Sequence, residues 1–120
     1  MQWQRRVLIV INHPIFRETV RYLLATDAHF VVVAEANSGE QAVVLAQRLE
    51  LDLVIMDMRL PGMNGFATAA MIKAHHPQII ILLLSGDWSP AYERKAKAVG
   101  VRARLAKQNL SLNHIYRVLS

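Results

Sequence analysis

The chain has 120 residues, of which 53% are hydrophobic and 19% are charged, and it contains no cysteine. This length supports one domain, and this composition is typical of a globular protein rather than a disordered one. The lack of cysteine excludes disulfides, thiolate zinc sites and cysteine nucleophiles, and it fits a cytoplasmic protein. The longest apolar run, residues 79–84, is far shorter than the ~20 residues that span a bilayer, so we expect no membrane insertion.

The net charge of +5 is concentrated toward the C-terminus. Up to Trp88, seven basic residues accompany eight acidic ones, whereas seven basic residues after it accompany only Glu93. The basic residues singled out are Arg94, Lys95, Lys97, Arg102 and Arg104. We interpret them as a contact face for an acidic partner, with a simple solvated surface as the alternative. Nucleic-acid binding is less favoured, because this stretch lacks interleaved aromatic residues for base stacking.

Strand-like and helix-like patterns alternate five times along the chain. Apolar or β-branched runs begin near Val7, Val31, Leu53, Ile79 and Arg102. A helical pattern, with apolar residues three and four positions apart, follows each run. Ser38 with Gln41 forms a capping box at one helix start, and Gly100 stands where a helix ends. The sequence therefore predicts an α/β fold over residues 1–120, with a five-stranded parallel sheet and helices on both faces.

Polar residues collect at the carboxyl ends of these predicted strands. Asn12 follows the first strand, Asp57 ends the third, Ser85 ends the fourth and Lys107 follows the fifth. If the strand order is 2-1-3-4-5, these ends are neighbours and share one pocket. A carboxylate can attack phosphorus to give an acyl phosphate, a hydroxyl can hydrogen-bond a phosphoryl oxygen, and a lysine can pair with the added charge. Each residue alone has a simpler interpretation as a turn or surface residue, but their shared rim favours aspartyl-phosphate chemistry.

Three segments carry a family resemblance: Val-Ile-Met-Asp-Met-Arg-Leu-Pro-Gly-Met-Asn-Gly at 54–65, Leu-Ser-Gly at 84–86 and Leu-Ala-Lys at 105–107. With them, essentially the whole chain resembles the receiver domains of two-component response regulators. The stretch His-Pro-Ile-Phe-Arg-Glu at 13–18 resembles the branch whose members carry a LuxR-type helix-turn-helix output domain. This resemblance implies a flavodoxin-like fold in a single receiver-like domain.

The resemblance also implies roles and partners. Asp57 would be the phosphoacceptor, Ser85 the switch hydroxyl and Lys107 the phosphoryl-binding lysine, while the Arg59 backbone carbonyl would be a magnesium ligand. The signalling surface would run over the fourth helix, fifth strand and fifth helix. A histidine kinase or phosphotransfer protein would be the partner. A C-terminal DNA-binding domain outside this chain and a homodimer are further expectations.

Three positions depart from the family pattern. Ile11 and Asn12 stand where the family has two acidic residues that hold magnesium, and Arg104 replaces an aromatic residue that turns inward on activation. The remaining metal donors would be Asn12, Asp57 and the Arg59 carbonyl, so we expect weak Mg²⁺ binding. At an effective dielectric near 20, two unit charges ~4 Å apart interact by ~4 kcal/mol, so each missing carboxylate matters. With these acids absent, we predict a direct ion pair between Lys107 and Asp57.

Two functions remain open from the sequence. The favoured one is a phosphoacceptor signalling domain that receives a phosphoryl group on Asp57. The alternative is a pseudo-receiver that acts without phosphorylation, as a protein-interaction module. An enzyme, such as an aspartyl-phosphate phosphatase, is disfavoured, because Arg59 stands where that class needs a second acid.

Overall fold

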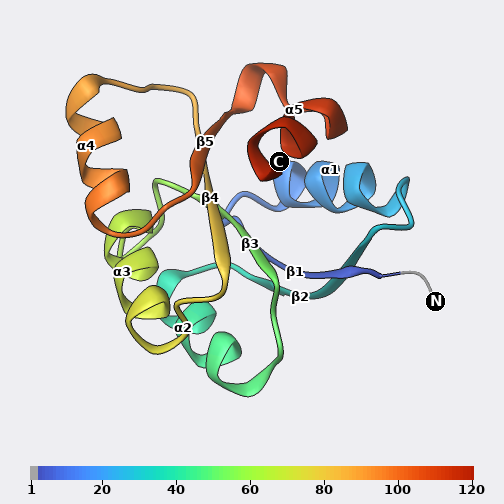
Figure 1. The fold of residues 1–120 in the computed structure, drawn as a ribbon, viewed down its shortest axis with the longest axis horizontal. Coiled ribbons are helices and arrows are strands. Elements are labelled where there is room, and N and C mark those ends of the chain that lie inside the picture. The colour runs from blue at the N-terminus through green and yellow to red at the C-terminus, as the bar shows by residue number, and fades with distance from the viewer. Residues whose placement is uncertain (1–2) are drawn as a thin grey trace.

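Five parallel strands form one sheet in the computed structural model, which describes residues 3–120 (Figure 1). The strands are β1 (Arg5–Val10), β2 (Phe30–Ala36), β3 (Leu53–Asp57), β4 (Ile80–Ser85) and β5 (Ala103–Ala106). Their order across the sheet is β2-β1-β3-β4-β5, and every neighbouring pair is parallel. The predicted fold class and strand order are confirmed.

A helix follows each strand. The helices are α1 (Pro14–Ala25), α2 (Gly39–Arg48), α3 (Gly65–His75), α4 (Pro90–Ala98) and α5 (Leu112–Leu119), and the short 3-10 turn η1 (Lys107–Asn109) follows β5. Within residues 3–120, none of these helices has the length and hydropathy needed to cross a membrane.

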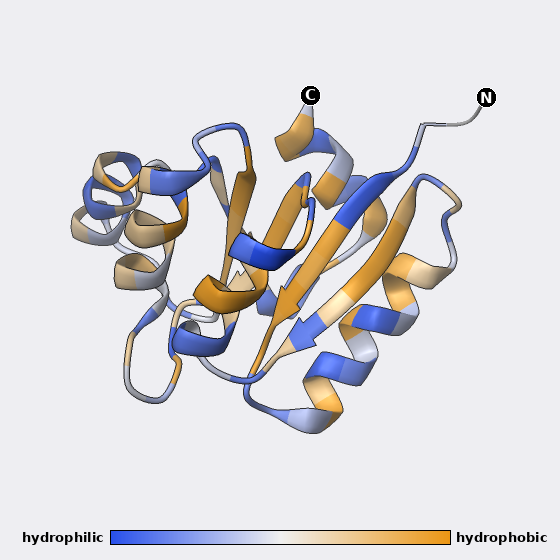
Figure 2. Ribbon diagram, turned by 90° about the horizontal axis from the view of Figure 1, so that it is seen from below, coloured by the Kyte–Doolittle hydropathy of each residue, from blue (hydrophilic) through white to orange (hydrophobic). Residues whose placement is uncertain are grey.

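The strands are buried because helices cover both faces of the sheet. Helices α1 and α5 lie on one face, and α2, α3 and α4 lie on the other (Figure 1). Successive strand residues point to opposite faces, so Val7 and Ile9 enter the core under α1 and α5, while Leu8 and Val10 enter the other core. Two-sided burial explains why the strands read as continuous apolar runs, which Figure 2 shows as hydrophobic bands through the sheet.

Side-chain caps set where the helices begin. The Ser38 hydroxyl accepts from the Gln41 amide at 3.1 Å at the start of α2, as predicted. The Gln41 side chain reaches back to the amide of Asn37 at 2.9 Å, one residue before the position of an ideal capping box. Gly100 follows α4 with a φ of 89°, a left-handed conformation that a side chain would strain. These local signals therefore set the loop between β2 and α2 and the loop between α4 and β5.

Candidate functional site

The carboxyl ends of β3, β4 and β5 meet at one edge of the sheet. Asp57 is the last residue of β3, Ser85 is the last of β4, and Lys107 follows β5 directly. Parallel pairing sets Asp57 opposite Leu84, and Ser85 opposite Ala106. Asp57, Ser85 and Lys107 line one cavity of about 210 Å³. The structure therefore brings together these three side chains from segments far apart in the sequence.

Asp57 and Lys107 form the ion pair predicted from the sequence. The Lys107 Nζ lies 3.0 Å from the Asp57 Oδ2, and the Asp57 side chain is only 9% exposed. The other carboxylate oxygen accepts from the Arg59 amide at 3.3 Å. The Lys107 Nζ also lies 5.5 Å from the ring centroid of Phe16 on α1, within the range of a cation–π contact. A buried carboxylate is therefore neutralised by one ammonium that also rests on an aromatic ring.

The β4–α4 loop is tied to β5 and to the turn after it. The Arg104 Nη2 donates to the carbonyl of Ser85 at 3.0 Å and to that of Gly86 at 3.4 Å. The Gln108 Nε2 donates to the same Gly86 carbonyl at 3.0 Å. The Ser85 hydroxyl, which is buried, donates to the carbonyl of Asp87. The hydroxyl of Ser85 is therefore engaged within its own loop.

Arg104 is half-buried and turned toward this loop rather than outward. Its guanidinium lies 5.8 Å from the ring of Trp88, and its Nε is buried with no hydrogen-bond partner within residues 3–120. The Trp88 ring in turn lies 6.0 Å from Tyr92 and donates its Nε1 to Glu93 at 2.7 Å. Its hydrogen bonds and its aromatic contact therefore hold the Arg104 side chain against the β4–α4 loop.

The expected magnesium donors are only partly assembled. Ile11 is fully buried in the hydrophobic core, and Asn12 is exposed and outside the set of residues that line the Asp57 cavity. Within the described residues, no group of three or more histidine or acidic side chains is arranged to hold a metal. A hard dication needs several oxygen ligands, and here the nearby carboxylate is already paired with the Lys107 ammonium. This arrangement does not fit a strong magnesium site.

The basic residues singled out from the sequence differ in their surroundings. Arg94, Lys95 and Lys97 on α4 are exposed, as is Arg102 just before β5. The charge of Arg102 also acts on a neighbouring cation: burial first, and then Arg102, lower the pKa of Lys73 on α3. Arg104 differs from the rest, because its guanidinium is used in the β4–α4 loop. The exposed cations therefore lie along α4 and the approach to β5.

Three contacts of the site were not anticipated from the sequence. Phe16 supports Lys107, Gln108 bonds the Gly86 carbonyl, and Asp87 lies 3.6 Å from the Arg59 guanidinium at the rim. Gln108 directly follows Lys107 and Asp87 is two residues after Ser85, and this closeness was a usable signal, since residues near a strand end share its rim. Phe16 carried no such signal, because its position depends on how α1 packs.

The chain matches the response regulator receiver domain over residues 7–119, and it belongs to this family. Receiver domains are signalling domains of two-component systems. The nitrate/nitrite response regulator protein NarP of Escherichia coli (strain K12) is 42% identical over 89 residues, which cover 72% of this chain and 41% of NarP. The chain spans between about a third and about half of the length of the curated relatives it matches.

Solved receiver structures have the same fold. The receiver domain of the putative response regulator NarL from Mycobacterium tuberculosis has a TM-score of 0.89 and 31% identity, over 98% of this chain and 94% of that one. A LuxR-family two-component response regulator from Aurantimonas sp. SI85-9A1 also has a TM-score of 0.89, with 28% identity over 97% of this chain and 83% of that one. These relatives confirm the resemblance to the LuxR/NarL branch.

Proposed function

We propose that this receiver domain accepts a phosphoryl group on Asp57 and signals through α4, β5 and α5. The observation that carries the proposal is the buried Asp57 carboxylate with the Lys107 ammonium 3.0 Å away, on the rim that also holds Ser85. The carboxylate supplies the nucleophile, and the ammonium supplies a counter-charge for the phosphoryl oxygens. The donor would be a histidine kinase or a phosphotransfer protein, as in the family.

The transfer follows from these groups. A carboxylate oxygen of Asp57 forms a bond to phosphorus, the P–N bond of the donor phosphohistidine breaks, and the imidazole leaves with the electron pair and takes up a proton. The Lys107 ammonium then moves from the carboxylate to a phosphoryl oxygen. The Ser85 hydroxyl can donate to a second phosphoryl oxygen once it leaves the Asp87 carbonyl. Transfer therefore requires two existing contacts to open.

Weak magnesium binding is part of this proposal. The expected metal ligands carry only one negative charge, that of Asp57; the other two, Asn12 and the Arg59 carbonyl, are neutral. The Lys107 ammonium already lies against the Asp57 carboxylate and would repel a bound magnesium ion. We therefore expect phosphorylation to be slow and to depend only weakly on magnesium.

The proposed partners follow the family. Exposed Arg94, Lys95, Lys97 and Arg102 suit an acidic partner surface at the proposed signalling face. A role in transcription regulation through a DNA-binding output domain, a homodimer and a cytoplasmic location belong to the same proposal. The domain itself acts as a signalling module and not as an enzyme.

Two observations favour a second candidate, a receiver that acts without phosphorylation. The Asp57–Lys107 pair already sets the ammonium against the carboxylate, and Arg104 and Gln108 already hold the β4–α4 loop. Such a domain would keep one conformation and present a constant interaction surface.

The deciding experiment treats the protein with phosphoramidate, with and without magnesium, and measures its intact mass. The phosphoacceptor proposal expects one added phosphoryl group, which Asp57→Asn abolishes. Asp52→Asn is the matched control, because Asp52 lies before β3 at the opposite end of the strand. A missing adduct under both conditions would instead favour the constant interaction module.

A further inference from the structure

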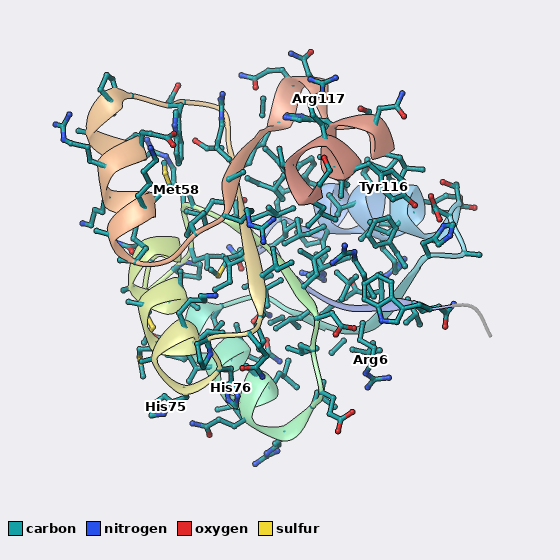
Figure 3. The ribbon with its side chains drawn as sticks, in the orientation of Figure 1. Arg6, Met58, His75, His76, Tyr116 and Arg117 are labelled. Carbon is teal, nitrogen blue, oxygen red and sulfur yellow. The ribbon has the colours of Figure 1, made fainter. Side chains whose placement is uncertain are left out.

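A second, larger cavity lies next to the Asp57 site. Its volume is about 420 Å³, within the range of small-molecule sites, and it lies between the β3–α3 connection and α4. Met58 and Arg59 line both cavities, whereas Asp57, Ser85 and Lys107 line only the smaller one. Figure 3 shows Met58 beside α4, on the side of the sheet away from α5. This larger cavity has no part in the proposed phosphoryl transfer.

The inner wall of the larger cavity is apolar and aromatic. Met58 and Leu60 contribute aliphatic surface, and the rings of Phe66 and Tyr92 lie 5.9 Å apart at an interplanar angle of 41°. Phe66 is 5% exposed, so its ring is anchored in the core, and Trp88 packs against Tyr92. The anchored Phe66 ring and the packed Tyr92 ring form a surface on which a flat apolar group gains contact at low entropic cost.

The polar groups of the cavity are hydrogen-bond donors. Arg59 and Lys95 carry positive charge, and the Lys95 Nζ lies 5.4 Å from the Phe66 ring centroid, above the apolar wall. The Asn64 side-chain oxygen already accepts from the Ala67 amide at 2.9 Å, which leaves its amino group as the remaining polar function. No carboxylate is among the residues found to line this cavity in the described chain. The rim is therefore suited to an anion.

We propose that this cavity binds a small aromatic carboxylate. The ring packs against Phe66 and Tyr92, and the carboxylate accepts hydrogen bonds from Lys95 and Arg59. The Arg59 side chain is 73% exposed, and its one ion pair within residues 3–120 is a 3.6 Å contact with Asp87, so it is available to turn toward the ligand. The binding does not require Asp57 to be phosphorylated, so it stands or falls independently of the proposed function.

The test titrates ¹⁵N-labelled protein with 2-naphthoate and, separately, with the neutral 2-naphthamide, and follows backbone amide shifts. For 2-naphthoate we expect saturable shifts at residues 58–60, 64–66 and 92–95, with a dissociation constant of about 1 mM or lower. The amide has the same ring and lacks the charge, so we expect it to bind about fivefold more weakly.

Two variants of α4 separate the site from general charge effects. Lys95→Gln should weaken 2-naphthoate about fivefold, because it removes the cation at the apolar wall. Lys97→Gln makes the same charge change on an exposed residue of the same helix that does not line the cavity, and it should leave the affinity unchanged. Equal binding of acid and amide, equal effects of the two variants, or shifts centred elsewhere would overturn the proposal.

Discussion

The Arg104 Nη2 donates to the Ser85 carbonyl across 3.0 Å, and this bond joins β5 to the last residue of β4 outside the strand ladder. A second bond from the same nitrogen reaches Gly86, and the guanidinium rests beside Trp88. Where the family resemblance implies a mobile aromatic residue, this chain has a cation that holds the loop. Changes at Arg104 therefore test how firmly the β4–α4 loop is held.

Arg104→Ala should loosen the β4–α4 loop. Loss of a hydrogen bond from a charged donor to a half-buried carbonyl should lower the free energy of unfolding by about 1–2 kcal/mol, as measured by urea denaturation. Amide hydrogen exchange at residues 86–88 should accelerate as well. Arg102→Ala is the control, since Arg102 is exposed, and its effect should stay within about 0.5 kcal/mol. Equal stability and equal exchange in the two variants would contradict this role of Arg104.

Lys107→Met should destabilise the domain by stranding the buried Asp57 carboxylate. Because Lys107 is 35% exposed, the expected loss is about 2 kcal/mol, below the cost of breaking a fully buried pair. Asp57→Asn should cost less, since it removes the buried charge itself. The variant that carries both substitutions should lose less free energy of unfolding than the sum of the two single losses, by about 1 kcal/mol or more. Chemical denaturation of the unaltered protein, the two single variants and the double variant measures this difference. Additive losses would mean that the two groups do not interact energetically.

Asn12→Asp should strengthen magnesium binding at the strand edge. Val10 of β1 is paired with Met56 of β3, so Asn12, two residues beyond Val10, lies past the end of β1 at the same edge of the sheet as Asp57, and the substitution adds negative charge at that edge. We expect about tenfold tighter binding, followed through the amide shifts of residues 57–59 during a magnesium titration. Asn113→Asp on α5 is the control for added charge alone. If both variants bind magnesium equally well, Asn12 is not a metal ligand.

The contact between Tyr116 and Asp27 predicts a pH effect on stability. The Tyr116 hydroxyl donates to the Asp27 Oδ2 at 2.5 Å, from α5 toward the turn before β2 (Figure 3). This bond, followed by the bond from the His29 amide, holds the pKa of Asp27 below its ordinary value of 3.8. Because the folded state binds this proton less tightly than the unfolded state, the contact stabilises the fold above pH 3.8. That stabilisation is lost as the pH falls through the lowered pKa.

Tyr116→Phe should therefore bring the pKa of Asp27 closer to its ordinary value, as read from the carboxyl carbon shift during an acid titration. The acid limb of the stability curve should become shallower in the same variant. Tyr22→Phe is the matched control, because Tyr22 is exposed on α1. If Asp27 titrates at the same pH in Tyr116→Phe, the Tyr116 hydroxyl does not lower the pKa of Asp27.

The sequence by itself determined the elements and their order. Apolar runs such as residues 79–84 have to be buried on both sides, and the amphipathic segments between them have to cover them. Since parallel strands expose their carboxyl ends at one edge, the meeting of Asp57, Ser85 and Lys107 was also predictable. The ion pair followed because few other charges were available there to partner Lys107.

Only the tertiary structure decided where the long side chains turn. The sequence marked Arg104 as a cation of the basic face and as the replacement for an aromatic residue, but not that its guanidinium folds onto the Ser85 carbonyl. The aromatic cavity between the β3–α3 connection and α4 likewise joins Phe66 to Tyr92 across 26 positions of sequence. Spacing along the chain specifies the face of an element, whereas the direction of a flexible side chain depends on which donors, acceptors and rings packing brings near it.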